Sequence, residues 1–154
     1  GNSAVALSYE GLAWVTGAAI AVGGELPSGP ILLIALLYSI GAHGIMTLND
    51  FKSVEGDLKL GIRSLPAQLG RARAAKVACA FMLLPQLGVI GLLTNWQLNP
   101  SAFTVALVVA AQLLCMKRLL SDPERFAPWY NASGVSLYVL GMMSAALGLG
   151  GWLT

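Results

Sequence analysis

The chain has 154 residues, of which 56% are hydrophobic and 10% charged, with a formal net charge of +2 and a mean hydropathy of +0.73. A soluble globular domain carries about 25% charged residues, so this composition excludes a water-soluble fold, which could not bury so much apolar surface. Much of the chain must lie in lipid.

Five apolar stretches follow one another along the chain, at about 4–23, 29–48, 74–94, 102–120 and 131–153. Each is close to the ~20 residues that a helix needs to cross ~30 Å of hydrocarbon. Only helices and closed barrels satisfy their backbone groups in lipid, and these runs are too long for barrel strands. We therefore predict an all-α fold, in which residues 1–154 form a single polytopic bundle of about five transmembrane helices.

The basic residues lie in or beside two of the four links between these helices. The link 49–73, with Lys76 at its edge, and the link 117–128 hold all nine Lys and Arg residues. Helices in series place these two links on the same side of the bilayer, which the positive-inside rule predicts to be cytoplasmic. The chain starts at Gly1 and its first basic residue is Lys52, so we expect no signal peptide and a chain that begins inside a longer protein.

The most informative segment lies where the second predicted helix leaves the membrane. If that helix continues through Asp57, Asp50 lies about two turns before it, and both carboxylates project from one face. Together with Asn49 they offer hard oxygen ligands, which suit Mg²⁺ when a phosphate supplies further oxygens. Lys52, Lys59 and Arg63 lie close by in the sequence and can neutralise an anionic ligand.

A solvated cytoplasmic loop with mixed charges and no site is the alternative interpretation of this segment. Carboxylates clustered at a membrane exit, beside basic residues, favour the phosphate site.

This segment also resembles a known family. Residues 49–57 read NDFKSVEGD and residues 61–66 read GIRSLP, which is similar to the second aspartate-rich motif of chlorophyll and bacteriochlorophyll synthases, in the UbiA-type membrane prenyltransferases. The segments 127–134 and 8–11 resemble the same group, and the resemblance covers essentially the whole chain. Many members of the superfamily carry an Asp four residues before the position of Asp57, where this chain has Ser53.

The resemblance implies a fold of about nine transmembrane helices with two aspartate-rich motifs. The first motif is absent from this sequence, so the resemblance implies that the chain is the C-terminal half, helices five to nine. The expected partners are the lipid bilayer, the N-terminal half of the same enzyme and photosynthetic assembly proteins, with no nucleic acid. The expected location is the inner or intracytoplasmic photosynthetic membrane, with the Asp-rich loop on the cytoplasmic side.

The activity implied by the resemblance is Mg²⁺-dependent esterification of chlorophyllide or bacteriochlorophyllide with a geranylgeranyl or phytyl group from its diphosphate. On this basis Asp50 and Asp57 are expected to hold Mg²⁺, with Asn49 assisting. The resemblance also implies diphosphate contacts from Lys52, Lys59 and Arg63.

Other candidate residues have two interpretations each. Tyr9 and Glu10 lie inside the first helix, where an acid requires a cavity or a partner, so they line a cavity near the acceptor or form a helix-pairing hydrogen bond. His43 binds the central Mg of a pigment or forms a hydrogen bond between helices. Tyr130 and Asn131, which we expect at the cytoplasmic start of the last helix, contact the substrate or belong to an aromatic belt.

Two other classes of protein remain open. A transporter or channel fragment would place ionisable residues near mid-membrane, whereas Asp50 and Asp57 lie at a membrane exit. A structural subunit of a photosynthetic assembly is the second alternative. Within the enzyme class, the acceptor can instead be a quinone precursor or haem.

Overall fold

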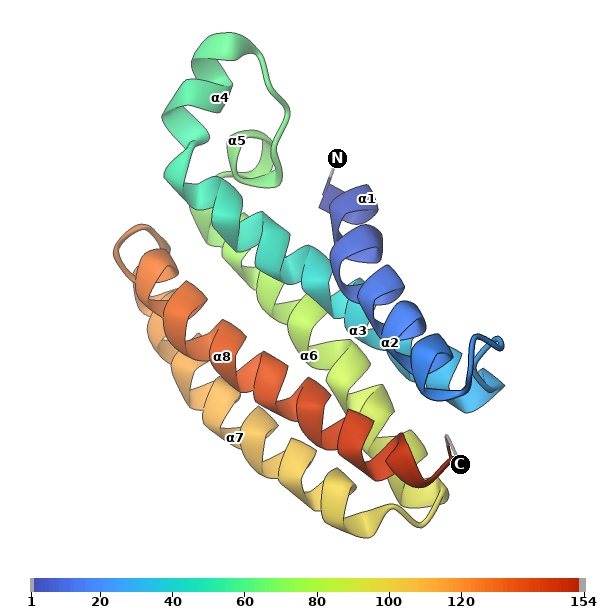
Figure 1. Ribbon diagram of the computed structural model, residues 1–154. Coiled ribbons are helices and arrows are strands. Elements are labelled where there is room, and N and C mark those ends of the chain that lie inside the picture. Colours follow the sequence, from blue (N-terminus) through green and yellow to red (C-terminus); the bar gives the residue numbers. More distant parts are fainter. Residues whose placement is uncertain (1, 153–154) are drawn as a thin grey trace.

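The computed structural model describes residues 2–152, and in that range it contains helices and no strands. Five segments are long and apolar enough to cross a membrane: Ala4–Ala21, Gly29–Lys52, Arg71–Asn95, Asn99–Ser121 and Pro123–Leu149. The predicted all-α bundle with five transmembrane helices is therefore confirmed, and the chain is an integral membrane protein. Figure 1 shows the five segments side by side as one elongated bundle.

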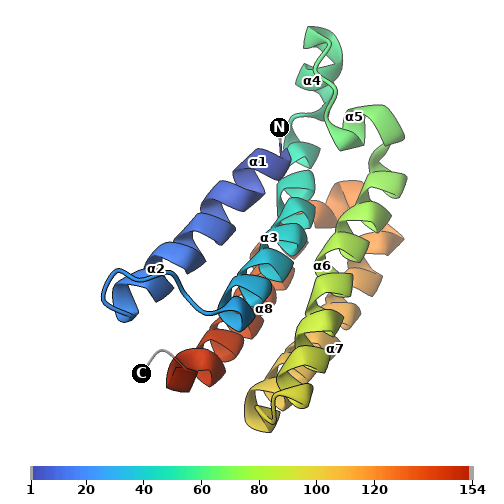
Figure 2. The same cartoon turned by 90° about the vertical axis from the view of Figure 1, so that its right-hand side faces the viewer.

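The long helix α3 (Gly29–Asn49) organises the bundle. The N-terminal segment, made of α1 (Asn2–Ala6), the π-helix η1 (Leu7–Leu12) and α2 (Ala13–Ala21), packs on one side of it. The helix α6 (Arg71–Asn95) packs on another side, and α8 (Pro123–Leu149) contacts both α3 and α6 (Figures 1 and 2). The helix α7 (Asn99–Ser121) covers α6 and α8 from outside.

Small residues allow α3 to approach its neighbours closely. A Cβ atom at Gly44 would lie 2.5 Å from the backbone carbonyl oxygen of Ala78 on α6, and one at Gly41 would overlap the hydroxyl of Tyr138 on α8. That hydroxyl donates a 2.7 Å hydrogen bond to the backbone carbonyl of Tyr38. In lipid, where apolar burial does not drive helices together, close packing of this kind and interhelical hydrogen bonds hold a bundle.

The last helix begins at Pro123, earlier than the predicted start near residue 131. Asp122 caps it by accepting a 3.2 Å hydrogen bond from the backbone N–H of Arg125, and a proline is favoured in the first turn. The predicted start was wrong because the charged residues of the first turn, together with Pro128, have the composition of a polar connection between two helices. Consequently Tyr130 and Asn131 lie inside α8 and not at its start.

The expectation that the second helix continues through Asp57 is also wrong. After α3 the chain forms a 3-10 turn, η2 (Asp50–Lys52), and a new helix, α4 (Val54–Leu60), follows Ser53. Ser53 has φ −110° and ψ 0°, outside the helical region, and its hydroxyl contacts the Asp50 carbonyl oxygen at 3.1 Å. Serine commonly competes with a helix in this way.

The expected polar link between the second and third membrane helices is a small helical cap. The helix α4 ends at Leu60, and Gly61 caps it with a φ of 68°, a left-handed conformation that favours glycine. A short helix, α5 (Leu65–Leu69), then leads into α6. The cap extends beyond the bundle at the same end as the turn between α7 and α8 (Figures 1 and 2), and it forms one wall of the candidate site.

Candidate functional site

A hollow of about 340 Å³ lies where α3 gives way to the α4–α5 cap. Asp50 and Asp57 both line it, so the two carboxylates share one site although the helix between them is broken. We call this space the carboxylate hollow; its lining residues are His43, Asp50, Ser53, Asp57, Ile62, Arg63, Ser64 and Leu65.

Ser53 connects the two acidic positions. Its hydroxyl lies 3.2 Å from a carboxylate oxygen of Asp57, and the backbone N–H of Asp57 donates to the Ser53 carbonyl at 2.8 Å. Asp57 is only 8% exposed. A buried carboxylate is stable only when it is paired, hydrogen-bonded or bound to a metal. The Ser53 hydroxyl contacts one carboxylate oxygen of Asp57, and a cationic ligand in the hollow would stabilise the charge further.

The side chains of the hollow fit a metal ion that is shared with a ligand. The described residues contain no group of three or more His, Cys, Asp or Glu side chains that could hold a metal ion. Two carboxylates with further oxygens from a phosphate are, however, a common arrangement for Mg²⁺. The predicted ligands Asp50 and Asp57 therefore fit Mg²⁺ only together with a phosphate or water.

The predicted diphosphate contacts are divided by the structure. Arg63 lines the carboxylate hollow, where its backbone carbonyl accepts a 2.6 Å hydrogen bond from Gln68. Lys52 lines a separate hollow, and Lys59 is exposed and lines neither. Only Arg63 among the three predicted cations lies with the two carboxylates.

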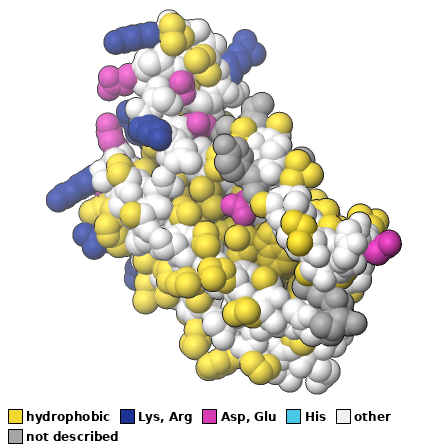
Figure 3. All heavy atoms as spheres, viewed as in Figure 1, with side chains coloured by type: hydrophobic (Ala, Val, Ile, Leu, Met, Phe, Trp, Pro, Cys, Tyr) yellow, Lys and Arg dark blue, Asp and Glu magenta, His cyan; other side chains and the backbone are white. Residues whose placement is uncertain are grey.

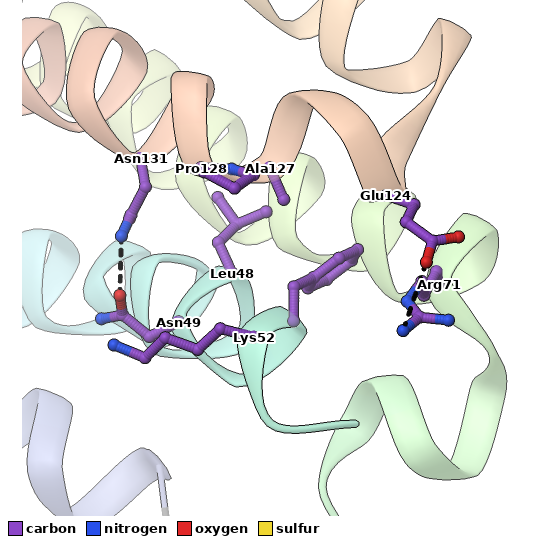
Figure 4. A pocket seen from close by; sticks show the side chains of 9 residues that line it. Leu48, Asn49, Lys52, Arg71, Glu124, Ala127, Pro128 and Asn131 are labelled. Atoms are coloured by element: carbon purple, nitrogen blue, oxygen red, sulfur yellow. Dashed lines mark hydrogen bonds and ion pairs between the residues drawn. The ribbon is translucent and has the colours of Figure 1, made fainter. Parts of the chain in front are cut away.

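The separate hollow has a volume of about 390 Å³ and lies between the end of α3 and the start of α8. Asn49 and Asn131 meet there, with a 2.7 Å hydrogen bond from Nδ2 of Asn131 to Oδ1 of Asn49. Figure 4 shows this pair at one end and the Arg71–Glu124 ion pair, at 3.5 Å, at the other. We call this space the amide hollow.

The amide hollow changes the expectation for Asn49. Its side chain lines the amide hollow and not the carboxylate hollow, and its amide oxygen is engaged by Asn131. No spacing pattern in the sequence predicts this pair. Tyr130, one residue before Asn131, is fully buried, and its ring lies where a side chain at Gly134 would be.

Glu10 lies in a third hollow, at membrane depth. This hollow of about 360 Å³ is lined by Glu10 and otherwise apolar residues from α2, α3 and α8, such as Trp14, Ile31 and Met142. We call it the apolar groove, and Figure 3 shows hydrophobic side chains gathered over this face of the bundle, with Lys and Arg at the α4 end. Glu10 belongs to the π-helix η1, and the side chain of Tyr9 lies outside the described residues.

His43 lines the carboxylate hollow from α3. Its ring packs edge-on against Phe81 of α6, with centroids 4.7 Å apart. The buried Nδ1 atom has no hydrogen-bond partner in the part of the chain that the structure describes, so this nitrogen does not form the predicted hydrogen bond between helices.

The chain is similar to known proteins over most of its length. Residues 3–138 match the UbiA prenyltransferase family. The chain is 53% identical to a bacteriochlorophyll synthase 33 kDa chain from Cereibacter sphaeroides, over 98% of this chain and 50% of that protein. It is 48% identical to a bacteriochlorophyll synthase 34 kDa chain from Chloroflexus aurantiacus, over 97% of this chain and 47% of the relative.

A plant relative extends the comparison. The chain is 37% identical to a chloroplastic chlorophyll synthase from Arabidopsis thaliana, over 96% of this chain and 38% of that protein. The chain thus spans about half or less of the length of these relatives. No solved structure matches it.

Proposed function

The chain belongs to the UbiA prenyltransferase family, and from this premise we propose that it is part of a chlorophyll or bacteriochlorophyll synthase. Such an enzyme joins a geranylgeranyl or phytyl group, delivered as the diphosphate, to the propionate of chlorophyllide or bacteriochlorophyllide. The bacteriochlorophyll and chlorophyll synthases to which the chain is similar support the proposal, because they match nearly the whole chain.

One structural observation carries the proposal: Asp50 and Asp57 share a hollow with Arg63 at the end of a membrane-spanning helix. A polyprenyl diphosphate has a charged head and an apolar tail. A site at a membrane exit accepts the head beside charged side chains while the tail remains in lipid. A transporter site near mid-membrane would not need this arrangement.

The reaction makes one bond and breaks another. An oxygen of the propionate forms a C–O bond to the allylic carbon of the prenyl group, and the C–O bond to the diphosphate breaks, releasing diphosphate with its electron pair. In our proposal Arg63 stabilises the charge that develops on the leaving group. Asp50 and Asp57 would hold Mg²⁺, which would offset the charge of the diphosphate.

The other hollows suit the remaining parts of the substrates. The apolar groove suits an apolar part of a substrate, and we assign Glu10 and Tyr9 to the region near the acceptor. The amide hollow places Lys52 beside Asn49 and Asn131 (Figure 4), where these residues can bind a polar substituent of a substrate. Lys59, being exposed, attracts the anionic head group of the donor at the membrane surface.

We further propose how the chain is placed in the cell. It forms a single transmembrane domain, the C-terminal part of a larger enzyme, and it is completed by the N-terminal half. The end of the bundle that bears α4 faces the cytoplasm, because the basic residues are gathered there. The membrane is the inner or intracytoplasmic photosynthetic membrane, where assembly proteins are further partners.

The proposal is tested by esterification in membranes that contain the whole enzyme. The substrates are bacteriochlorophyllide, geranylgeranyl diphosphate and Mg²⁺, and the variant is Asp57→Asn, which keeps an acceptor for Ser53 while removing the charge. We expect no measurable ester from this variant. Glu55→Gln is the matched control, since Glu55 is exposed and lines no described hollow; near-normal turnover by Asp57→Asn would overturn the assignment.

A further inference from the structure

The carboxylate hollow contains two polar atoms that the roles assigned so far do not use. Nδ1 of His43 and Oγ of Ser64 are both shielded from solvent, and neither has a hydrogen-bond partner among residues 2–152. Both residues line the hollow together with the two carboxylates. Buried polar groups in native proteins are nearly always satisfied, so two unsatisfied atoms in one hollow indicate a ligand that supplies the missing partners.

Ser64 is at a position where its hydroxyl would normally cap a helix. It precedes α5, yet its side chain makes no capping hydrogen bond. Pro66, near the start of α5, has no N–H to offer, and the Ser64 backbone carbonyl already accepts from the N–H of Gln68 at 3.0 Å. The hydroxyl therefore makes no bond to the helix that it precedes, although a serine before a helix usually bonds to the helix itself.

His43 is held with its ring in place. The imidazole packs edge-on against Phe81, and its Nδ1 atom is shielded from solvent. His43 also does not form a compact metal-binding group with Asp50 and Asp57 in the described part of the chain. Its unsatisfied nitrogen is therefore better explained by a ligand atom than by a shared metal ion.

The chemistry of the hollow points to an anion that arrives with a cation. Asp50 and Asp57 would repel a bare phosphate, but a bound cation between them and the phosphate removes this repulsion. Arg63, Ser64 and the N–H form of Nδ1 are hydrogen-bond donors for phosphate oxygens. A diphosphate, with several acceptor oxygens, can satisfy these donors and share a cation with the carboxylates.

We propose that His43, through Nδ1, and Ser64, through Oγ, donate hydrogen bonds to the diphosphate of the prenyl donor. This inference rests on the proposed function, because it names further contacts to the same substrate. It assigns His43 to the donor and not to the central Mg of the pigment. It also gives Ser64 a binding role.

The experiment uses the whole enzyme in membranes and inorganic pyrophosphate as a competitive probe. Ser64→Ala and His43→Leu should each raise the Ki of pyrophosphate and the KM of geranylgeranyl diphosphate by about tenfold, as expected for loss of a hydrogen bond to a charged group. The KM of the pigment acceptor and the half-saturating Mg²⁺ concentration should not change. His43→Asn, whose amide N–H can replace Nδ1, should restore most of the pyrophosphate affinity.

Stability separates this role from a structural one. Since neither atom has a partner in the free protein, Ser64→Ala should leave the thermal unfolding temperature unchanged or raise it, whereas loss of a structural hydrogen bond or bridging water would lower it. Ser136→Ala is the matched control, because Ser136 is exposed and its hydroxyl already bonds to the Ala132 carbonyl at 2.6 Å. If His43→Leu does not accumulate, His43→Ala takes its place as the variant that removes Nδ1, and Ser64→Ala tests the second donor independently.

The outcomes also separate this inference from the proposed function. An inactive Asp57→Asn enzyme together with an unchanged pyrophosphate Ki in Ser64→Ala and His43→Leu would overturn the inference alone. An active Asp57→Asn enzyme would overturn the proposed function. If His43→Leu changed only the KM of the pigment acceptor, His43 would be a contact of the pigment and the inference would be contradicted.

Discussion

Asn131 on α8 donates a 2.7 Å hydrogen bond to the side chain of Asn49 at the end of α3, although 82 residues separate them in the sequence. This bond joins the last helix of the chain to the residue that immediately precedes Asp50. It therefore connects the packing of α8 with the position at which the carboxylate hollow begins.

The first prediction concerns this amide pair. Asn131→Ala should lower the free energy of unfolding by about 1 kcal/mol, because a half-buried amide of Asn49 loses its partner. Thermal unfolding in detergent measures the change, with a double-mutant cycle to Asn49→Ala to isolate the coupling. Asn95→Ala, at the exposed end of α6, is the control; a coupling energy of zero would mean that the pair does not hold α8 to α3.

Much of the fold could be predicted from the sequence because the membrane imposes a length and a composition on each helix. All five membrane helices were predicted, and the starts of the first two differ little from those observed. The start of α8 was missed because the capping by Asp122 and the tolerance of Pro128 within a helix depend on local backbone geometry. Hydropathy does not record that geometry.

The candidate site was less predictable from the sequence for a physical reason. The seven-residue spacing of Asp50 and Asp57 predicted a common face, and the two residues do share a hollow, but through a turn at Ser53 and not along one helix. Helical spacing could not show that Asn49 turns toward α8, because this depends on a contact with Asn131. The role proposed for Ser64 could not be predicted from the sequence either, because it depends on the observation that the Ser64 side chain does not cap α5.

The second prediction concerns the approach of α3 to α6. Gly44→Ala should destabilise the protein by about 1–3 kcal/mol, because the added methyl group would lie 2.5 Å from a backbone oxygen of Ala78, which cannot rotate away. Gly91→Ala, on α6, is the matched control, since a Cβ there meets nothing within 4 Å. The unfolding temperatures of the two variants in detergent decide the matter, and equal values would contradict the close packing.

The third prediction concerns a buried pair of amides inside the membrane. Gln86 donates to Gln112 at 2.7 Å, and Gln112 donates to the backbone carbonyl of Gly134 at 3.0 Å, so that α6, α7 and α8 are joined. Gln86→Leu alone leaves the Gln112 carbonyl without its partner, and it should cost about 1–3 kcal/mol. In the double variant with Gln112→Leu the loss should be smaller than the sum of the two single losses.

A double-mutant cycle on the unfolding free energy measures this difference. The matched control is Gln97→Leu, at an exposed position in the link before α7. Strictly additive losses in the double variant would show that the two glutamines act independently.

The last prediction ranks the cations around the carboxylate hollow. Arg63 and Lys59 are both exposed, but only Arg63 lines the hollow, so Arg63→Ala should lower kcat/KM for the prenyl donor by about 100-fold and Lys59→Ala by less than about threefold. Arg63→Lys should recover only part of the loss, because an ammonium group does not reproduce the fork of donors in a guanidinium.

Steady-state assays at two salt concentrations separate the roles of the two cations. The small effect of Lys59→Ala should disappear at high salt, where long-range attraction is screened, and the effect of Arg63→Ala should persist. A larger loss from Lys59→Ala than from Arg63→Ala would show that the diphosphate binds outside the carboxylate hollow.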